Sequence, residues 1–170
     1  MDGDLFTVFS GAPENLLPPP GTADPASRYV LSGWHGNWRE AKEAVAEART
    51  ALQIARRTAQ TELLHYSDLG LDLLLLSVSK EPEARALLHS LLNPLLDYDA
   101  KTRGELVHTL ETYLDSNHNA KRTAALLHAH YNTIIYRIQK IESLLDRSLD
   151  DSRTALQLAV ALKLRPYLKS

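Results

Sequence analysis

The chain has 170 residues, of which 44% are hydrophobic and 24% are charged, and its formal net charge is −2. This composition is typical of a globular protein, and the length suits one domain or two small ones. The absence of cysteine excludes disulfide bonds and thiolate metal sites. No apolar run approaches the ~20 residues that cross a bilayer, and no basic segment precedes an apolar core as in a secretion signal. A cytoplasmic protein that does not enter the membrane is therefore expected.

The charges are unevenly distributed along the chain. Residues 104–170 contain nine Lys or Arg and seven Asp or Glu, whereas residues 1–103 contain ten and fourteen. The asymmetry is modest, but it indicates that the C-terminal part is the one suited to nucleic acid.

Residues 1–27 show the least sign of regular structure. Leu5–Phe9 could form a short strand, but the segment after it is rich in proline and glycine and includes Pro18, Pro19 and Pro20 in succession. Such a composition is typical of a loop or linker. We expect residues 1–27 to be a loop or flexible segment.

Residues 28–78 are expected to form a partial α/β unit. Residues 28–32 resemble the end of a strand, and residues 33–36 a turn. Asn37 and Glu40 have the spacing of a capping box, which predicts a long helix to about Thr58. Ser67, Asp68 and Gly70 then indicate a turn. Apolar residues repeat every three or four positions along the predicted helix: Ala41, Ala44, Val45, Ala48, Leu52 and Ala55.

Two further helices are predicted between residues 79 and 115. Pro82 suits the first turn of a helix that runs to about Leu92, where Asn93 and Pro94 should interrupt it. Thr102 and Glu105 have the spacing of another capping box. The helix that they would open has one apolar face, formed by Leu106, Leu110, Tyr113 and Leu114.

The segment from Asn119 to Leu145 predicts two helices separated by a short break. Asn119 suits the N-cap of a short first helix, and Ala129 and His130 fall at the break. The second helix has one narrow apolar stripe of Ile134, Ile138, Ile141 and Leu145. At about 100° per residue, another set falls on the opposite side: Asn132, Thr133, Tyr136 and Lys140.

This segment is also free of acidic residues. No Asp or Glu occurs from Ser116 to Ile141, whereas this stretch includes Lys121, Arg122, Arg137 and Lys140. A second helix that is amphipathic and free of acids suits insertion into the major groove of DNA. A helical hairpin with a basic outer face is the alternative that periodicity alone leaves open.

A last helix is expected to begin at Asp150, Asp151 or Ser152. One face would consist of Leu156, Ala159, Val160 and Leu164, with Leu158 and Leu162 extending it. A helix that is apolar on more than one side is usually buried. It could also supply a dimer contact.

Specific residues in the two-helix segment resemble the C-terminal helix-turn-helix domain of the PucR/CdaR family of bacterial transcriptional regulators. The shared pattern is T-A-x-x-L-H-x-H-x-N-T-x-x-Y-R-I, from Thr123 to Ile138. The resemblance implies a mainly α fold that ends in a Fis-like helix-turn-helix domain over residues 79–170. The words WREAKEAVAEARTAL and HYSDLGLDLLL resemble the tail of the GGDEF-like central domain that precedes it. Residues 28–78 are therefore interpreted as a remnant of that domain.

No catalytic activity is expected from this chain. The cyclase signature of GGDEF domains does not occur in it, nor does the sensory region typical of the family. His118, His128 and His130 could be imagined as a metal site, but no thiolate or paired carboxylate accompanies them. Roles in turns and caps explain these histidines better, so neither a metal nor another cofactor is expected.

These observations predict a transcriptional regulator that binds double-stranded DNA. Asn132 and Thr133 are expected at base edges or nearby phosphates, and Arg137 and Lys140 mainly at phosphates. At the start of the preceding helix, three residues could hold the DNA backbone, namely Lys121, Arg122 and Thr123. His130, Tyr131 and Tyr136 complete the predicted site.

Two further expectations concern assembly and the alternative function. Helix-turn-helix domains commonly bind as dimers, so a homodimer is expected, preferably through the helix from Asn37 to Thr58 and otherwise through the last helix. Tyr131 stands where the family commonly has Arg or Lys. This departure leaves open a truncated regulator that acts as a dimerisation or partner-binding module without productive DNA binding.

Overall fold

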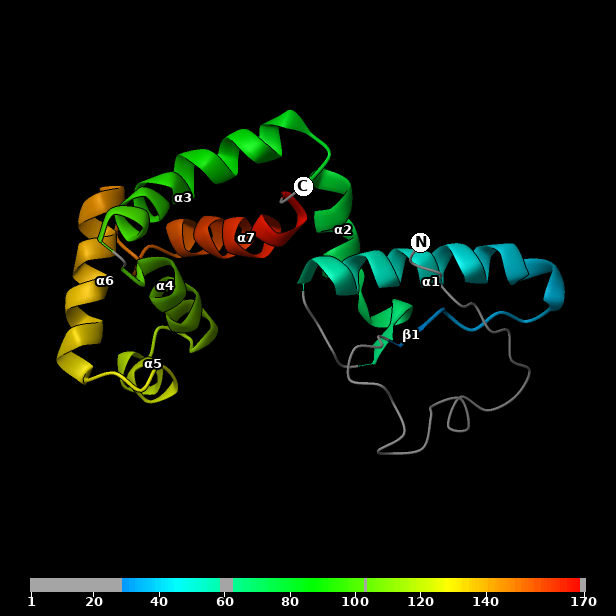
Figure 1. Ribbon diagram of the computed structural model, residues 1–170, viewed down its shortest axis with the longest axis horizontal. Coiled ribbons are helices and arrows are strands. Elements are labelled where there is room, and N and C mark those ends of the chain that lie inside the picture. The colour runs from blue at the N-terminus through cyan, green and yellow to red at the C-terminus, as the bar shows by residue number, and fades with distance from the viewer. Residues whose placement is uncertain (1–28, 59–62, 103, 169–170) are drawn as a thin grey trace. The chain divides into compact units, whose positions relative to one another are not determined.

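The computed structural model describes residues 29–58, 63–102 and 104–168 (Figure 1). They form seven α-helices and two short strands, in two compact units that divide between Leu74 and Leu75. The mainly α fold is thereby confirmed. The predicted loop over residues 1–27 lies outside the described residues, and the predicted domain boundary after residue 78 stays a prediction. None of the described helices is long and apolar enough to span a membrane.

The first unit contains a β–α–β arrangement. β1 (Val30–Leu31) and β2 (Leu64–His65) pair in parallel, with Val30 opposite Leu64. Parallel strands need a crossover connection, and α1 (Ala41–Thr58) lies between them in the sequence. A partial α/β region is therefore present, whereas its relation to a GGDEF-like domain stays a prediction.

The start of α1 follows the predicted capping pattern. Asn37 Oδ1 accepts a hydrogen bond from the backbone N–H of Arg39 at 2.9 Å, and Glu40 Oε2 accepts one from the backbone N–H of Gly36 at 3.0 Å. Trp38–Glu40 forms a 3-10 turn before the helix proper. These contacts satisfy backbone donors that the first turn leaves unpaired. The fully buried side chains of the helix are Ala51, Ile54 and Ala55.

A helix that the sequence pattern does not predict follows β2. Tyr66–Asp68 forms a 3-10 turn, which includes two of the expected turn residues, but Gly70 begins α2 (Gly70–Val78) instead of extending the turn. The run of leucines from Leu73 to Leu76 has no helical period of apolar and polar residues. Periodicity therefore could not identify this helix.

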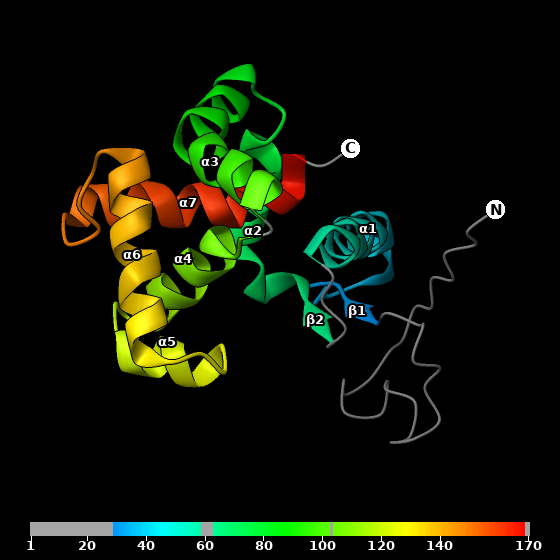
Figure 2. The same ribbon diagram turned by 60° about the vertical axis from the view of Figure 1, so that its left-hand side comes forward.

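The second unit is built around one hydrophobic core. α3 (Pro82–Thr102) and α7 (Ser152–Leu168) run side by side, and α4 (Leu106–Asp115) and α6 (Tyr131–Leu145) pack against α3 (Figures 1 and 2). α5 (Ala120–Leu126) contacts α4 and α6. The core thus supports the two helices that follow α4.

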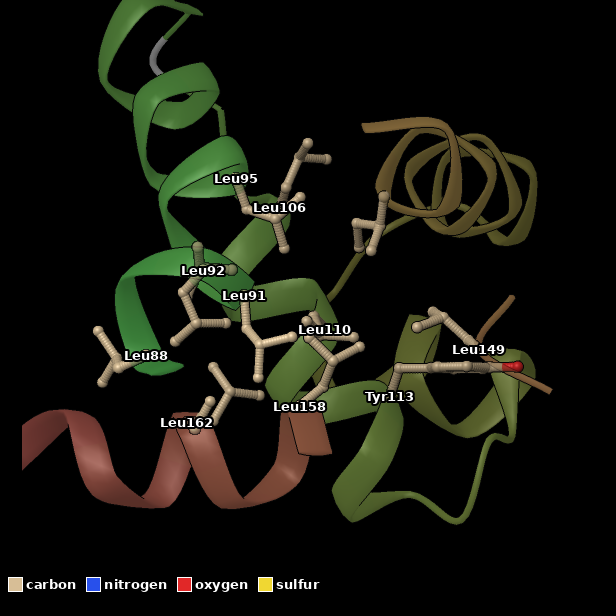
Figure 3. Packing of buried hydrophobic residues seen from close by; sticks show 13 residues of the cluster. Leu88, Leu91, Leu92, Leu95, Leu106, Leu110, Tyr113, Leu149, Leu158 and Leu162 are labelled. Carbon is tan, nitrogen blue, oxygen red and sulfur yellow. The ribbon is translucent and has the colours of Figure 1, made fainter. Parts of the chain in front are cut away.

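Leucines supply most of this core. Figure 3 shows Leu91 and Leu92 of α3 on the side that faces Leu158 and Leu162 of α7, with Leu110 of α4 beside them. Leu92, Leu110 and Leu158 are completely buried. Burial of such side chains stabilises the unit by about 1.5–3 kcal/mol each before the entropy cost of folding is counted.

α3 is longer than the sequence pattern predicts. The expected interruption at Asn93 and Pro94 does not occur, and Pro94 lies inside a continuous helix. Proline removes one backbone hydrogen bond from a helix interior. Leu92 and Leu95 on either side of it are completely buried, and their burial offsets that loss.

The predicted capping box of α4 is wrong. Thr102 is the last residue of α3, and its hydroxyl donates to the backbone carbonyl of Tyr98 at 2.9 Å. The Glu105 side chain makes no capping hydrogen bond, although Glu105 occupies the N-cap position.

Asp99 of the preceding helix caps α4 instead. Its carboxylate accepts hydrogen bonds from the backbone N–H groups of Leu106 at 2.8 Å and Val107 at 2.9 Å. A carboxylate at this position also stabilises the positive end of the helix dipole. Gly104 makes the approach possible, since a Cβ there would lie 2.6 Å from Asp99 Oδ1.

α7 begins where predicted, and it buries part of the predicted apolar face while leaving another part exposed. Asp151 Oδ2 accepts from the backbone N–H of Thr154 at 2.9 Å. Hydrogen bonds from the side chain and backbone of Thr154 lower the pKa of the Asp151 carboxyl. Of the face predicted from Leu156 to Leu164, Leu156 is 65% exposed and Val160 is 38% exposed. Leu164 of that face is buried, as are Leu158 and Leu162, which are predicted to extend it, and Ala155 and Ala161 complete the buried side.

Candidate nucleic-acid interface

A tight turn leads from α4 into α5. Asn117 and His118 both have positive φ angles, 53° and 61°. The His118 ring stacks on Tyr113 with their centroids 5.2 Å apart, which ties the turn to α4. Burial, followed by the negative charges of Asp150 and Glu142, raises the pKa of the Tyr113 hydroxyl.

The N-cap predicted for α5 is confirmed. Asn119 Oδ1 accepts a hydrogen bond from the backbone N–H of Arg122 at 3.0 Å. An asparagine side chain at this position replaces the missing backbone acceptor of the first turn. This cap fixes the start of α5 at Ala120, so that the exposed Arg122 lies in the first turn of the helix.

A second tight turn separates α5 from α6. His128 has a positive φ of 49°, and the backbone N–H of Ala129 donates to the Ala124 carbonyl at 3.0 Å, which closes the C-terminus of α5. His130 is the N-cap of α6, and its Nδ1 atom accepts from the backbone N–H of Asn132 at 3.2 Å. An imidazole nitrogen accepts only without its proton, so this cap requires the neutral ring protonated at Nε2.

The apolar stripe predicted for α6 faces the core. Ile134 and Ile141 are completely buried, and Ile138 and Leu145 are half-buried and pack against the core cluster. This contact turns the opposite side of the helix toward solvent. Figures 1 and 2 show α6 along one side of the unit, with α5 near its N-terminal end.

The exposed face of α6 is polar and uncharged. Asn132 and Thr133 are exposed, and the side chains of Tyr131 and Tyr136 are 43% and 60% exposed. Amide and hydroxyl groups can donate and accept hydrogen bonds at base edges. The structure therefore brings these four predicted site residues together at the first turns of the helix.

The predicted backbone-binding residues of α5 divide into two kinds. Lys121 and Arg122 are exposed, as a phosphate contact requires. Thr123 is completely buried, and its hydroxyl donates to the Asn119 carbonyl at 2.9 Å. This burial disfavours the contact with the DNA backbone that is predicted for Thr123 and indicates a structural role for its side chain.

Arg137 and Lys140 point away from the exposed face. Arg137 Nη2 lies 2.9 Å from a Glu105 carboxylate oxygen, and Nη1 donates to Thr109 Oγ1 at 3.2 Å. Lys140 Nζ lies 5.2 Å from the centre of the Tyr98 ring. The geometry disfavours the phosphate-binding role predicted for both, because their cationic groups already have partners on α3 and α4.

Sequence reasoning misses the partners of these cations. It assigns Glu105 to a helix cap and gives no role to Thr109 or Tyr98. Thr109 is 28 positions from Arg137, and no local spacing rule connects residues so far apart.

Among the residues that the structure describes, no group of three His, Cys, Asp or Glu side chains could hold a metal ion.

A short helix, a tight turn and a longer helix with an exposed polar face, all supported by α4, define a helix-turn-helix DNA-binding domain. Residues 106–164, from α4 into α7, match the family model of the PucR C-terminal helix-turn-helix domain. The resemblance identified in the sequence is thereby confirmed for this domain.

Three regulators of Bacillus subtilis (strain 168) are similar to the chain over a longer span. The purine catabolism regulatory protein is 35% identical over 126 residues, which are 72% of this chain and 23% of that protein. The proline-responsive transcriptional activator PutR is 32% identical over 124 residues, which are 72% of this chain and 30% of that protein. The DNA-binding transcriptional activator AdeR is 25% identical over 127 residues, which are 75% of this chain and 30% of that protein. The chain thus spans less than a third of each relative. No solved structure matches it.

Proposed function

We propose that this chain is a DNA-binding transcriptional regulator whose helix α6 enters the major groove. The observation that best supports this function is the exposed face of α6, which consists of uncharged hydrogen-bonding side chains within a PucR-type domain. Two of the relatives described above are named as transcriptional activators, and the third as a regulatory protein of purine catabolism. An α-helix fits the major groove, where each base pair presents a distinct pattern of donors and acceptors.

Asn132 and Thr133 are the proposed base-reading residues. Both lie in the first turn of α6 and are exposed, and the N-terminal end of a recognition helix is the part that reaches base edges. An asparagine side chain pairs with the N6 and N7 atoms of adenine, and a threonine hydroxyl serves any base. Tyr136, one turn further along, offers an exposed ring for apolar contact with a thymine methyl group.

Lys121 and Arg122 are the proposed phosphate contacts. The first helix of a helix-turn-helix crosses the DNA backbone, and both side chains are exposed at the start of that helix. They supply positive charge next to a recognition face that has none. Tyr131, where the family commonly has a cation, then adds a hydroxyl rather than a charge at the start of α6.

His130 contributes through the helix cap. Its Nδ1 atom holds the backbone N–H of Asn132, so the ring fixes the backbone from which that side chain projects. His130 is exposed, and we propose that the Nε2–H of the same neutral ring donates to a phosphate oxygen or a base acceptor.

The proposed assembly is a homodimer, because one recognition helix covers only a few base pairs. α1, the helix that the sequence favours for the contact, has no exposed large hydrophobic side chain among those described. α7 has two of them, Leu156 and Val160.

Light scattering should report a dimer for the chain and a monomer for the Leu156→Glu/Val160→Glu variant. A dimer that survives these substitutions would place the contact elsewhere.

The proposed place of action is the cytoplasm, where bacterial DNA lies, and no catalytic step is proposed. A partner-binding module without productive DNA binding is not favoured, since the recognition face is exposed and its supporting core is intact.

Selection from a randomised pool of duplexes tests the proposed function. The full chain should enrich one family of sequences, and anisotropy should show tighter binding to the enriched duplex than to its scrambled version. Specific sites are typically bound more than about 1,000-fold more tightly than nonspecific DNA. Absence of enrichment at low salt would contradict the proposed function.

A further inference from the structure

We propose that Arg137 is a positioning residue that sets the orientation of α6 on α4 and makes no contact with DNA. The inference rests on the proposed function, because it concerns how the recognition helix is held. It assigns a role to three residues: Arg137 of α6, Thr109 of α4, and Glu105 at the N-cap of α4. We call these three residues the α4–α6 clamp.

The clamp is a two-pronged contact. One guanidinium nitrogen of Arg137 lies 2.9 Å from the Glu105 carboxylate, and the other donates to Thr109 Oγ1 at 3.2 Å. Both distances are within hydrogen-bond range. A planar guanidinium that is held at two points has a fixed direction, which a single point charge would not have.

The hydroxyl oxygen of Thr109 is oriented to accept the hydrogen bond from Arg137. It is completely buried, and its hydroxyl donates to the backbone carbonyl of Glu105 at 2.7 Å. Since the single hydroxyl proton is used in that bond, the oxygen has lone pairs free for the Arg137 N–H. The direction of every bond in the clamp is therefore defined.

The position of Arg137 on α6 explains why its side chain turns inward. It lies three residues after Ile134 and four residues before Ile141, both completely buried. Residues at these spacings are neighbours on a helix surface. Apolar contacts hold one side of α6 on the core but are non-directional, whereas the clamp adds a directional contact that limits the remaining rotation of α6 about its own axis. That rotation decides where Asn132 and Thr133 point.

If Arg137 belongs to the clamp, removal of Glu105 should change the DNA affinity in the opposite direction from the one expected if Arg137 contacts a phosphate. Glu105 is 60% exposed at its side chain. Removal of a surface acid near a DNA site should tighten binding, because it removes repulsion of the phosphates. If Glu105 orients Arg137, and through it α6, its removal should instead weaken binding to the specific site.

The experiment uses the full chain and the duplex that it enriches from a randomised pool, with the scrambled duplex as reference. The variants are Glu105→Ala, Arg137→Ala and the double variant. Glu105 makes no side-chain cap, so Glu105→Ala removes none. Glu111→Ala, which removes an acid of α4 outside the clamp, is the matched control. Binding is measured at a temperature at which thermal unfolding shows every variant to be folded.

Glu105→Ala should weaken binding to the enriched duplex about tenfold, as expected for removal of one interaction in a coupled set. Binding to the scrambled duplex should not weaken. Arg137→Ala should weaken specific binding by a similar factor, and the double variant should be no weaker than Arg137→Ala alone. Glu111→Ala should bind at least as tightly as the unmodified chain.

Three results would overturn the inference: tighter specific binding by Glu105→Ala, the same behaviour for Glu105→Ala and Glu111→Ala, or additive losses in the double variant. Each leaves the proposed function standing, since an enriched duplex would already exist. Failure to enrich any duplex would instead contradict the proposed function, and the positioning role with it.

Discussion

α5 and α6 each have two cationic residues, yet they present them in opposite directions. Lys121 and Arg122 of α5 are exposed, whereas the cationic groups of Arg137 and Lys140 of α6 contact α4 and α3. The number of positive charges on a helix therefore says little about its contact with DNA. What matters is which of these charges already have a partner in the protein.

This difference suggests a division of labour between the two helices. The exposed face of α6 has no charge and suits hydrogen bonds to bases, while α5 has the charge that suits phosphates. Phosphate contacts position a protein on DNA, and base contacts provide sequence specificity. Each helix would then be testable separately, because the two kinds of contact respond differently to salt and to sequence.

The largest effect should come from the buried side of α6. Ile141→Asp places a carboxylate where the side chain is completely buried, and we expect a loss of about 3–5 kcal/mol in the free energy of unfolding. Thermal unfolding followed by circular dichroism measures this loss. Thr133→Asp, on the exposed side, should leave the melting temperature nearly unchanged and abolish DNA binding. Equal destabilisation by both variants would contradict the assignment of Ile141 to the buried side of α6 and Thr133 to its exposed side.

A smaller loss of stability should follow from removing the cap of α4, the helix that supports both α5 and α6. Asp99→Ala leaves the backbone N–H groups of Leu106 and Val107 without their acceptor. We expect a cost of about 2 kcal/mol, measured by denaturant unfolding. Asp97→Ala, an exposed acid on the same helix, should change stability by less than about 0.5 kcal/mol. An equal loss in both variants would contradict the capping role.

A change at the proposed base contact should alter specificity rather than stability. Asn132→Ala should reduce discrimination between the enriched and scrambled duplexes by about 1.5 kcal/mol, because one base would lose its partner. Competition anisotropy measures this difference. An unchanged ratio, with binding otherwise intact, would show that Asn132 does not read a base.

The features that the sequence predicts correctly are those that depend on near neighbours. The Asn119 cap involves a residue three positions away, and the burial of Ile134 and Ile141 follows from helical spacing. The family resemblance places the helix-turn-helix correctly because it includes residues of the turn itself. Local chemistry of this kind is present in the sequence before folding.

The features that the sequence does not reveal depend on contacts between helices. Asp99 caps α4 from the preceding helix, and Arg137 reaches Thr109 across 28 positions. Thr123 has a polar side chain, but its position on α5 buries it completely. The direction of a side chain relative to other helices is fixed by tertiary packing, which helical spacing within one segment does not determine.

The salt dependence of DNA binding tests the division of labour most directly. The slope of log affinity against log salt concentration changes by about 0.9 for each phosphate that the protein no longer neutralises. The Lys121→Ala/Arg122→Ala variant should therefore have a slope about 1.8 units shallower than that of the unmodified chain. The Arg137→Ala/Lys140→Ala variant, which removes the same charge, should keep the original slope even where its affinity falls. Equal reductions in slope for the two variants would contradict the account, since they would show that α6 contacts phosphates as α5 does.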